Sequence, residues 1–335
     1  MSETILVTGG AGYIGSHTVR LMAERGYRLV VLDNLVYGHR EALLSDAVTL
    51  VEGEMGDADL IEGIFSEHDI SAVIHFAAYA YVGESVEQPD KYYRNNTMAP
   101  MVVLDAMRRH GCKQFIFSST CATYGNPEYI PINEEHPQAP INPYGRSKLM
   151  LEWILEDYDR AYGIRSVKLR YFNACGASAD GLIGEDHDPE THLIPLVLMT
   201  LTGERENVTV FGTDYDTPDG TCIRDYIHIV DLARAHVLAL EHLKEGKPSF
   251  ACNLGTGRGV SVQEIIDIAE KLTDKKVPVV YGDRRAGDPP QLVADPSLAK
   301  EVLGWEAEYK DVAESIRTAW QWMSHPHGGR YGGGR

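Results

Sequence analysis

The chain has 335 residues, of which 44% are hydrophobic and 24% are charged, and its formal net charge at pH 7 is -18. This length is enough for two domains or one extended domain, and the composition is that of a soluble globular protein. A strongly acidic chain is repelled by phosphate backbones and by anionic headgroups, which excludes nucleic acid and membrane surfaces as partners.

Cysteine and histidine usage indicates the compartment and argues against a metal. The five cysteines are scattered, odd in number and without a Cys-x-x-Cys pair, and the 13 histidines show no His-Glu-x-x-His spacing. We therefore expect reduced thiols, a cytoplasmic protein and no metal site. A strand begins near Thr4 without a preceding signal peptide, and the chain has no apolar run long enough to span a bilayer.

The first predicted unit is a strand, a glycine-rich turn and a helix. Residues 4–8 form a short apolar run of the kind found in a strand buried on both faces. Gly9, Gly12 and Gly15 follow at once, and an amphipathic helix is expected over 16–25. Such glycines let the backbone approach a pyrophosphate, which rests on the helix N-terminus.

The second predicted strand, over 27–32, ends at Asp33. An acidic side chain at this distance from the glycine-rich turn is placed to hold the adenosine ribose diol of a dinucleotide. Its charge repels a 2'-phosphate, so the sequence favours NAD over NADP.

The same alternation continues through the first half of the chain. Further strands are predicted over 48–51, 72–76 and 115–117, and a helix over 90–110. The predicted fold class is therefore α/β, with a doubly wound parallel sheet of the Rossmann type. Ligands of such sheets lie beyond the carboxyl ends of the strands. Four residues are expected at those ends: Gly12, Asp33, Ala77 and Thr120.

A catalytic pair is predicted at the start of the next helix. Asn142 is a good N-cap and Pro143 fits the first helical position, so Tyr144 and Lys148 share one helix face. An ammonium beside a phenol favours the phenolate, which brings this base toward neutral pH. The hydroxyl of Thr120, at a strand end, is placed to share a proton with a substrate. A Tyr-x-x-x-Lys pair alone is a weak signal, and its value comes from the dinucleotide unit before it.

The second half predicts a smaller α/β substrate-binding domain. A Gly-, Asp- and Pro-rich loop covers 176–190 and is typical of a segment over a site. The remaining expected elements are a helix over 193–201, a strand over 208–211, a strand and helix over 227–243, and a helix over 260–272 with a capping box at Ser261 and Glu264. We expect a first domain over 1–175 rejoined by about 225–253, a second over 176–224 and 254–324, and a flexible tail over 325–335 in which His325 and His327 need no metal.

The turn Gly9-x-x-Gly12-x-x-Gly15, the strand-end Thr120 and the pair Tyr144-x-x-x-Lys148 resemble the extended short-chain dehydrogenase/reductase family. The likeness runs from Thr4 to about Trp322, and it is most specific in five blocks, at 82–85, 117–120, 170–173, 224–228 and 253–255. Within the family the chain is similar to UDP-sugar 4-epimerases, in the branch that contains plant UDP-arabinose 4-epimerases and rhizobial exopolysaccharide epimerases.

The resemblance implies NAD-dependent 4-epimerisation of UDP-glucose and UDP-galactose through a transient 4-keto sugar. Tyr144 would take the 4-hydroxyl proton, Thr120 would relay it, and Lys148 would bind the nicotinamide ribose and lower the pKa of Tyr144. It also implies a homodimer that associates through a helix bundle. The implied cofactor contacts are Gly9, Gly12, Tyr13, Ile14, Gly15, Asp33, Asn34, Glu54, Met55, Phe76, Ala77, Ala78, Asn95, Ser118, Tyr144, Lys148 and Tyr171. The implied substrate contacts are Thr120, Tyr144, Asn173, His192, Leu193, Phe211, Arg224, Arg285, Asp288 and Leu292.

Three alternatives stay open at this point. The branch makes UDP-xylose and UDP-arabinose a second substrate pair. A nucleotide-sugar oxidoreductase or dehydratase is less favoured, because Thr120 is followed by Cys121 and Ala122 rather than by an acid pair. An inactive NAD-binding regulator is disfavoured by the intact Thr120, Tyr144 and Lys148. Leu292 occupies the position that gates N-acetylated sugars, and its intermediate size predicts weak or no turnover of UDP-N-acetylglucosamine.

Overall fold

A seven-stranded parallel sheet forms the larger of two lobes in the computed structural model, which describes residues 3–285, 288–326 and 328–332. The strands lie in the order β10-β6-β5-β4-β1-β2-β3. Their bounds are β1 (Thr4–Thr8), β2 (Arg28–Asp33), β3 (Val48–Glu52), β4 (Ile70–His75), β5 (Gln114–Thr120), β6 (Arg165–Tyr171) and β10 (Phe250–Leu254). The predicted doubly wound sheet is confirmed.

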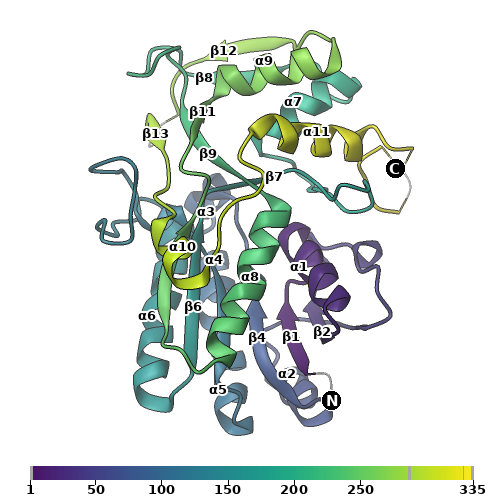
Figure 1. Cartoon of the computed structure of the whole chain (residues 1–335), viewed down its shortest axis with the longest axis vertical. Helices are drawn as coiled ribbons and strands as arrows, with labels where there is room; N and C mark the ends of the chain where they lie inside the picture. The colour runs from purple at the N-terminus through teal and green to yellow at the C-terminus, as the bar shows by residue number, and fades with distance from the viewer. Residues whose placement is uncertain (1–2, 286–287, 327, 333–335) are drawn as a thin grey trace.

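Helices cover both faces of this sheet, as Figure 1 shows. One face packs against α1 (Tyr13–Glu24) and α8 (Ile229–Lys244), and the other against α2 (Ala58–Glu67), α5 (Ala99–His110) and α6 (Pro143–Tyr162). Every residue of β1 is buried, which explains why this strand is an unbroken apolar run.

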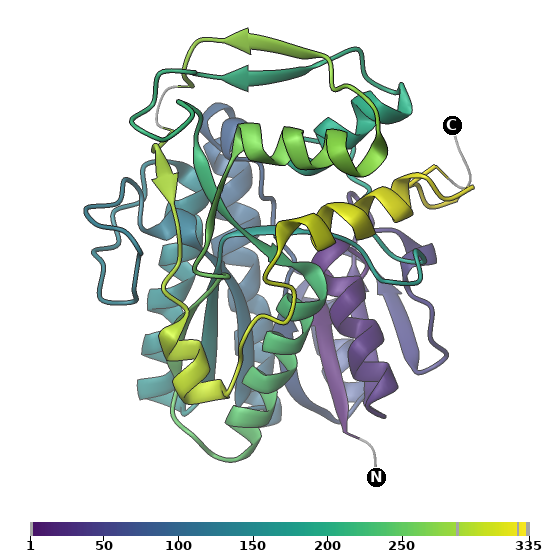
Figure 2. The same ribbon diagram turned by 45° about the horizontal axis from the view of Figure 1, so that its top comes forward.

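The smaller lobe lies across the carboxyl ends of the large sheet, at the top of Figures 1 and 2. In one sheet β9 (Ile223–His228) pairs with β7 (Asn173–Cys175), β11 (Gly259–Ser261) and β13 (Gln291–Leu292). A second sheet joins β8 (Val208–Phe211) to β12 (Val279–Gly282). The core of this lobe holds α7 (Leu193–Thr202), α9 (Val262–Thr273) and α11 (Val312–Met323). The predicted capping box of α9, between Ser261 and Glu264, is present.

Two predicted boundaries differ from the structure. The segment assigned to the second domain includes α10 (Ser297–Leu303), yet Ala299 and Trp305 belong to the core of the large sheet, and the Trp305 indole donates to Asp231 O at 2.9 Å. The helix predicted over 90–110 is divided, because α4 (Pro89–Tyr93) passes through a π-helical turn at Arg94–Met98 before α5 begins. The short helix α3 (Val82–Glu87) precedes it.

The tail over 325–335 was predicted to be flexible, and its described part is instead packed. The Tyr331 amide donates to Asp186 Oδ2 at 3.0 Å, and the Tyr331 ring lies 4.9 Å from that of Trp322. An aromatic residue among the glycines gives the tail an apolar anchor that composition alone hides. His327 lies outside the described residues.

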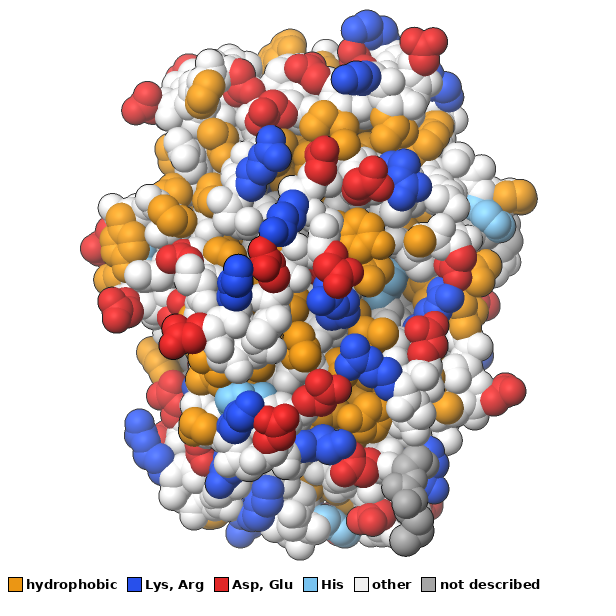
Figure 3. Space-filling model, viewed as in Figure 1, with side chains coloured by type: hydrophobic (Ala, Val, Ile, Leu, Met, Phe, Trp, Pro, Cys, Tyr) orange, Lys and Arg blue, Asp and Glu red, His pale blue; other side chains and the backbone are white. Residues whose placement is uncertain are grey.

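The surface is mixed in charge. Figure 3 shows acidic and basic side chains interspersed over one face, so the negative net charge is not gathered into one patch there. Among the helices that the structure describes, none combines the length and apolar character needed to cross a bilayer.

Candidate active site

A cleft with a cavity volume of about 440 Å³ lies between the two lobes, at the carboxyl ends of β1, β2, β4 and β5. Most of the residues predicted to bind a ligand line it: Gly9, Gly12, Tyr13, Ile14, Gly15, Asp33, Asn34, Glu54, Met55, Phe76, Ala77, Ala78, Asn95, Thr120, Tyr144, Lys148, Tyr171, Asn173, His192, Arg224, Asp288 and Leu292. Four predicted residues do not line it: Ser118, Leu193, Phe211 and Arg285.

The glycine-rich turn forms one end of the cleft. A Cβ on Gly9, where φ is +71°, would lie 2.5 Å from the amide nitrogen of Ala77, and a Cβ on Gly15 would lie 2.2 Å from Gly9 O. These positions therefore admit only glycine. Gly12 is the N-cap of α1 and has no side chain to cap it, so the first amides of this helix are available to an anion. The turn fits the diphosphate of NAD.

Asp33 is fixed in place at the end of β2. Its carboxylate accepts from the Ala11 amide through Oδ2 and from the Leu35 amide through Oδ1, both at 2.9 Å. Burial raises the pKa of Asp33, and these two amides oppose that rise. A carboxylate has about four acceptor positions, so two remain for a ribose diol.

The proposed base lies at the N-terminus of α6. Asn142 Oδ1 accepts from the Gly145 amide at 2.8 Å, as predicted for an N-cap, and Pro143 occupies the first turn. The nearby Thr120 hydroxyl lowers the pKa of Tyr144 and so favours its phenolate. Burial outweighs this effect and raises the pKa of Tyr144 above its ordinary value.

Lys148, which is expected to lower the pKa of Tyr144, contacts a backbone oxygen of β5 in the structure. Its ammonium donates to Ser118 O at 2.9 Å and lies 5.0 Å from the centre of the Phe117 ring. Burial lowers the pKa of Lys148 itself to about 7. The group that favours the Tyr144 phenolate in this structure is the Thr120 hydroxyl. Sequence spacing places a lysine on the same helix face, but it does not reveal which oxygen the lysine meets.

A buried polar network supports the strand that carries Thr120. The Arg170 guanidinium bonds the Glu152 carboxylate, with Nε to Oε1 at 3.0 Å and Nη2 to Oε2 at 2.6 Å. The Ser119 hydroxyl donates to the same Oε1 at 2.5 Å, and Arg170 also donates to the Tyr124 hydroxyl. Burial alone would raise the pKa of Glu152, but Arg170 holds it below the ordinary value. The pair thus fixes β5 and β6 against α6 behind the site.

The opposite end of the cleft carries the residues expected to hold a substrate. Arg224 Nη2 lies 3.7 Å from Asp288 Oδ1, and Arg285 Nε lies 3.4 Å from Asp288 Oδ2. The Arg285 guanidinium also covers the Phe211 ring, at 4.5 Å from its centre. Arg285 and Phe211 therefore lie beside the cleft, and the ion pair of Arg285 with Asp288 connects them to the cleft lining.

Of the other two residues outside the cleft, Ser118 is buried and Leu193 is partly buried. The Ser118 hydroxyl is engaged with His236 Nε2 at 2.9 Å. Leu193 is the first residue of α7 and packs against the core of the small lobe.

Comparison with known proteins gives a consistent result. The model of the NAD dependent epimerase/dehydratase family matches residues 5–255. The chain belongs to this family. It is 51% identical to the UDP-glucose 4-epimerase of Halalkalibacterium halodurans over 97% of each chain. The structure is similar to that of UDP-glucose 4-epimerase from Brucella ovis in complex with NAD, with a TM-score of 0.93 and 55% identity over 98% of this chain and 99% of that one. A UDP-glucose 4-epimerase from Stenotrophomonas maltophila, with bound NAD and formylated UDP-arabinopyranose, matches at a TM-score of 0.92 and 39% identity, over 96% and 97% of the chains.

This family member also has an aromatic wall that the sequence reading missed. Tyr37, Tyr79 and Tyr81 line the cleft, and the Tyr37 ring meets the other two edge-on at 6.0 and 5.3 Å. The tyrosines that directly follow the strand-end pair Ala77-Ala78 were the available signal.

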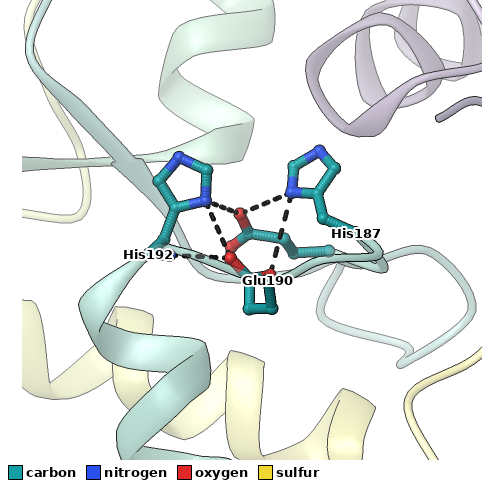
Figure 4. Close-up of side chains that lie close together, drawn as sticks. His187, Glu190 and His192 are labelled. Carbon is teal, nitrogen blue, oxygen red and sulfur yellow. Dashed lines mark hydrogen bonds and ion pairs between the residues drawn. The ribbon is translucent and has the colours of Figure 1, made fainter. Parts of the chain in front are cut away.

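The loop over 176–192 brings two histidines and two glutamates together at the edge of the cleft (Figure 4). Burial would lower the pKa of His187, but its hydrogen bond to Glu185 and the nearby Glu190 carboxylate raise it to about 9. The pKa of His192 is raised by the same carboxylates, and that of Glu190 is lowered to about 2 by the histidines, against its burial. The sequence signal for this cluster is the spacing Glu-x-His-x-x-Glu-x-His over 185–192, which the sequence analysis missed.

Proposed function

We propose that this chain catalyses NAD-dependent 4-epimerisation of UDP-sugars, with UDP-glucose and UDP-galactose as the first pair, which would place it in galactose metabolism. The observation that carries the proposal is that Thr120, Tyr144 and Lys148 line one cleft, between the glycine-rich turn and the Arg224–Asp288 edge. UDP-glucose 4-epimerases that are 51% and 55% identical to this chain over nearly its whole length support the proposal.

The reaction needs a proton acceptor beside the sugar 4-hydroxyl and a hydride acceptor at C4. Bound NAD supplies the hydride acceptor and, on the return, the hydride donor. Tyr144 Oη takes the 4-hydroxyl proton as the C4–O bond gains double-bond character, and Thr120 passes the proton between sugar and phenol. Arg224, with Arg285, grips the diphosphate, and guanidinium groups suit this anion. The 4-keto sugar would turn about this anchor and present its opposite face to the cofactor, and Tyr144 would then give its proton back to O4.

A second substrate pair, UDP-xylose and UDP-arabinose, follows from the same site. The Stenotrophomonas neighbour, whose bound ligand is an arabinopyranose derivative, favours it. Leu292 lines the cleft, and its side chain is intermediate in size between those of tyrosine and cysteine. We therefore infer weak or no turnover of UDP-N-acetylglucosamine. Rates near those with UDP-glucose would overturn that inference.

The deciding experiment incubates the purified protein with UDP-galactose and no added cofactor and separates the products by chromatography. We expect UDP-glucose without free NADH. Tyr144→Phe should lower the rate at least about a hundredfold, the range of general base catalysis. Tyr129→Phe, at an exposed tyrosine that bonds Asn133, is the matched control and should keep the rate. A loss below about tenfold in Tyr144→Phe would show that another group is the base.

We further propose a cytoplasmic homodimer. The five cysteines are all unpaired, which supports a reducing compartment. An apolar strip on α5 and α6 supports the dimer: Met101, Met150 and Trp153 are exposed there, Trp153 by 55%. The bond from the Tyr158 hydroxyl to Asp105 joins the two helices.

A further inference from the structure

Four side chains of one loop converge on a single point beside the cleft. Glu185, His187, Glu190 and His192 lie between β7 and α7, and one nitrogen or oxygen of each lies within 4.8 Å of all the others. Figure 4 shows both imidazole rings turned toward the carboxylates, with one nitrogen of each ring facing the oxygens.

The separations match those of ligands around one metal ion. His192 Nδ1 lies 2.8 Å from Glu185 Oε1 and 2.9 Å from Glu190 Oε1, while His187 Nδ1 lies 3.1 Å from Glu185 Oε1 and 3.7 Å from Glu190 Oε2. Four atoms placed tetrahedrally at zinc bond lengths are about 3.3 Å apart. The four separations, from 2.8 to 3.7 Å, lie on either side of this value, so small shifts of the side chains would admit one ion among them.

The carboxylates of Glu185 and Glu190 are neighbours and are buried, so a nearby positive charge is needed to stabilise their ionised forms. The side chains of Glu185 and Glu190 are each only 7% exposed, and their charges repel. Each Nδ1 points at a carboxylate oxygen, so a divalent cation among these atoms would be bound by nitrogen and oxygen donors and would offset the two carboxylate charges. Two imidazoles and two carboxylates form a borderline donor set, which suits zinc better than calcium or magnesium.

We propose that Glu185, His187, Glu190 and His192 bind one divalent transition metal of the zinc class. Each imidazole binds through Nδ1 and releases that proton to solvent. Nε2 of His192 then carries the remaining ring proton, and since His192 lines the cleft, it becomes a hydrogen-bond donor of fixed tautomer there.

The position indicates a structural role for the ion. The His187 ring meets those of Tyr13 and Tyr81 edge-on, at 6.2 and 6.5 Å, and the Tyr81 hydroxyl donates to Pro189 O at 3.0 Å. Tyr13 belongs to the glycine-rich turn and donates to Gly176 O at 2.6 Å. A metal in this loop would therefore hold it against the cofactor end of the cleft.

The test uses the full chain, stripped with a chelator and dialysed against Zn²⁺, with bound metal counted by mass spectrometry. We expect about one zinc per chain and a higher Tm in zinc than without it. Glu190→Gln keeps the side-chain size but removes a charged ligand, and it should weaken zinc binding at least about tenfold. The matched control is Glu62→Gln, because Glu62 forms an exposed pair with His110 at 2.7 Å. It should still bind one zinc.

Co²⁺ in place of Zn²⁺ identifies the ligands in the unaltered protein, even if a variant fails to fold. Ligand-field bands without a thiolate charge-transfer band are expected from nitrogen and oxygen donors. Zinc at less than about a tenth of an equivalent would overturn the proposal, and the cluster would then be closed by protons alone. Equal zinc binding in Glu190→Gln, or a thiolate band that assigns the metal to a cysteine, would overturn it too.

Discussion

At the scale of single residues, Lys148 combines full burial with a charge. It is 3% exposed, and burial lowers its pKa from about 10.5 to about 7, so the folded protein binds fewer protons than the unfolded chain between these values. Stability should therefore rise with pH across this window, and the cost of the buried charge should be largest below pH 7.

Lys148→Met removes this charge and keeps the side-chain length. We expect the variant to be more stable than the parent near pH 6, by on the order of 3 kcal/mol, and the gain to fade toward pH 10. Urea unfolding of the cofactor-free proteins at several pH values measures it. Lys113→Met, at an exposed lysine that bonds Tyr162 O, is the control without such a trend. An equal gain at all pH values would mean that the charge of Lys148 is not its cause.

Asp33 is the second residue whose charge has a measurable consequence. Asp33→Asn keeps an acceptor for the Ala11 or Leu35 amide and removes the charge that repels a 2'-phosphate. We expect the ratio of the Kd values for NADP and NAD to fall about tenfold, or 1.4 kcal/mol. Calorimetric titration of the cofactor-free protein with each dinucleotide gives the ratio. If it did not change, the preference would be set elsewhere in the cleft.

At the scale of elements, the start of α6 sits very close to the 3-10 turn at Cys121–Thr123. A Cβ on Gly145 would lie 2.5 Å from Ala122 O, which is backbone and cannot swing aside. Gly145→Ala should push the first turn of α6, which carries Tyr144, away from the 3-10 turn. The distance between Tyr144 and Thr120 should then increase. We expect an activity loss of at least about tenfold and a destabilisation of about 1–3 kcal/mol.

The control for that change lies in α2, where Gly63 has open space around its Cβ position. Gly63→Ala should keep full activity and stabilise the protein by up to about 1 kcal/mol, because alanine favours the helix. Initial rates and thermal unfolding of the two variants compare the effects. Full activity in Gly145→Ala would show that the position of Tyr144 tolerates a shift of this helix.

Elements also show how far the sequence can predict this molecule. Strands β1 to β5 of the large sheet, the cap at Asn142 and the capping box at Ser261 follow local rules, and the structure confirms them, whereas β6 and β10 were not predicted. The contact of Lys148 with Ser118 O does not follow, since it depends on how β5 and α6 pack. The histidine–glutamate cluster was missed for another reason: its ligands lie on a loop, where no helical spacing marks them.

At the scale of the whole molecule, the strip on α5 and α6 is the proposed dimer interface. Trp153→Asp places a charge at its centre, and we expect the proposed dimer to dissociate to a monomer at micromolar concentration, as measured by light scattering. Tyr281→Asp, at an equally exposed aromatic residue in the small lobe, should remain dimeric. A monomeric parent protein would refute the dimer outright.

The division into lobes was the part least accessible to sequence reasoning at this scale. Trp305 lies late in the chain, after the small lobe has been built, yet its indole donates to Asp231 O in α8. Such a return is decided by long-range packing, because the local pattern around 297–307 is that of an ordinary short helix.

The tail is anchored by Tyr331, which contacts the loop over 176–192 in the middle of the chain. Tyr331 bonds the amide of Gly184 through its hydroxyl at 3.1 Å and bonds Asp186 through its own amide, on either side of Glu185. Shortening the protein by its last few residues would remove both bonds at once. Terminal processing, or a partner that binds Tyr331, would therefore change the contacts of two residues in the loop at the edge of the cleft.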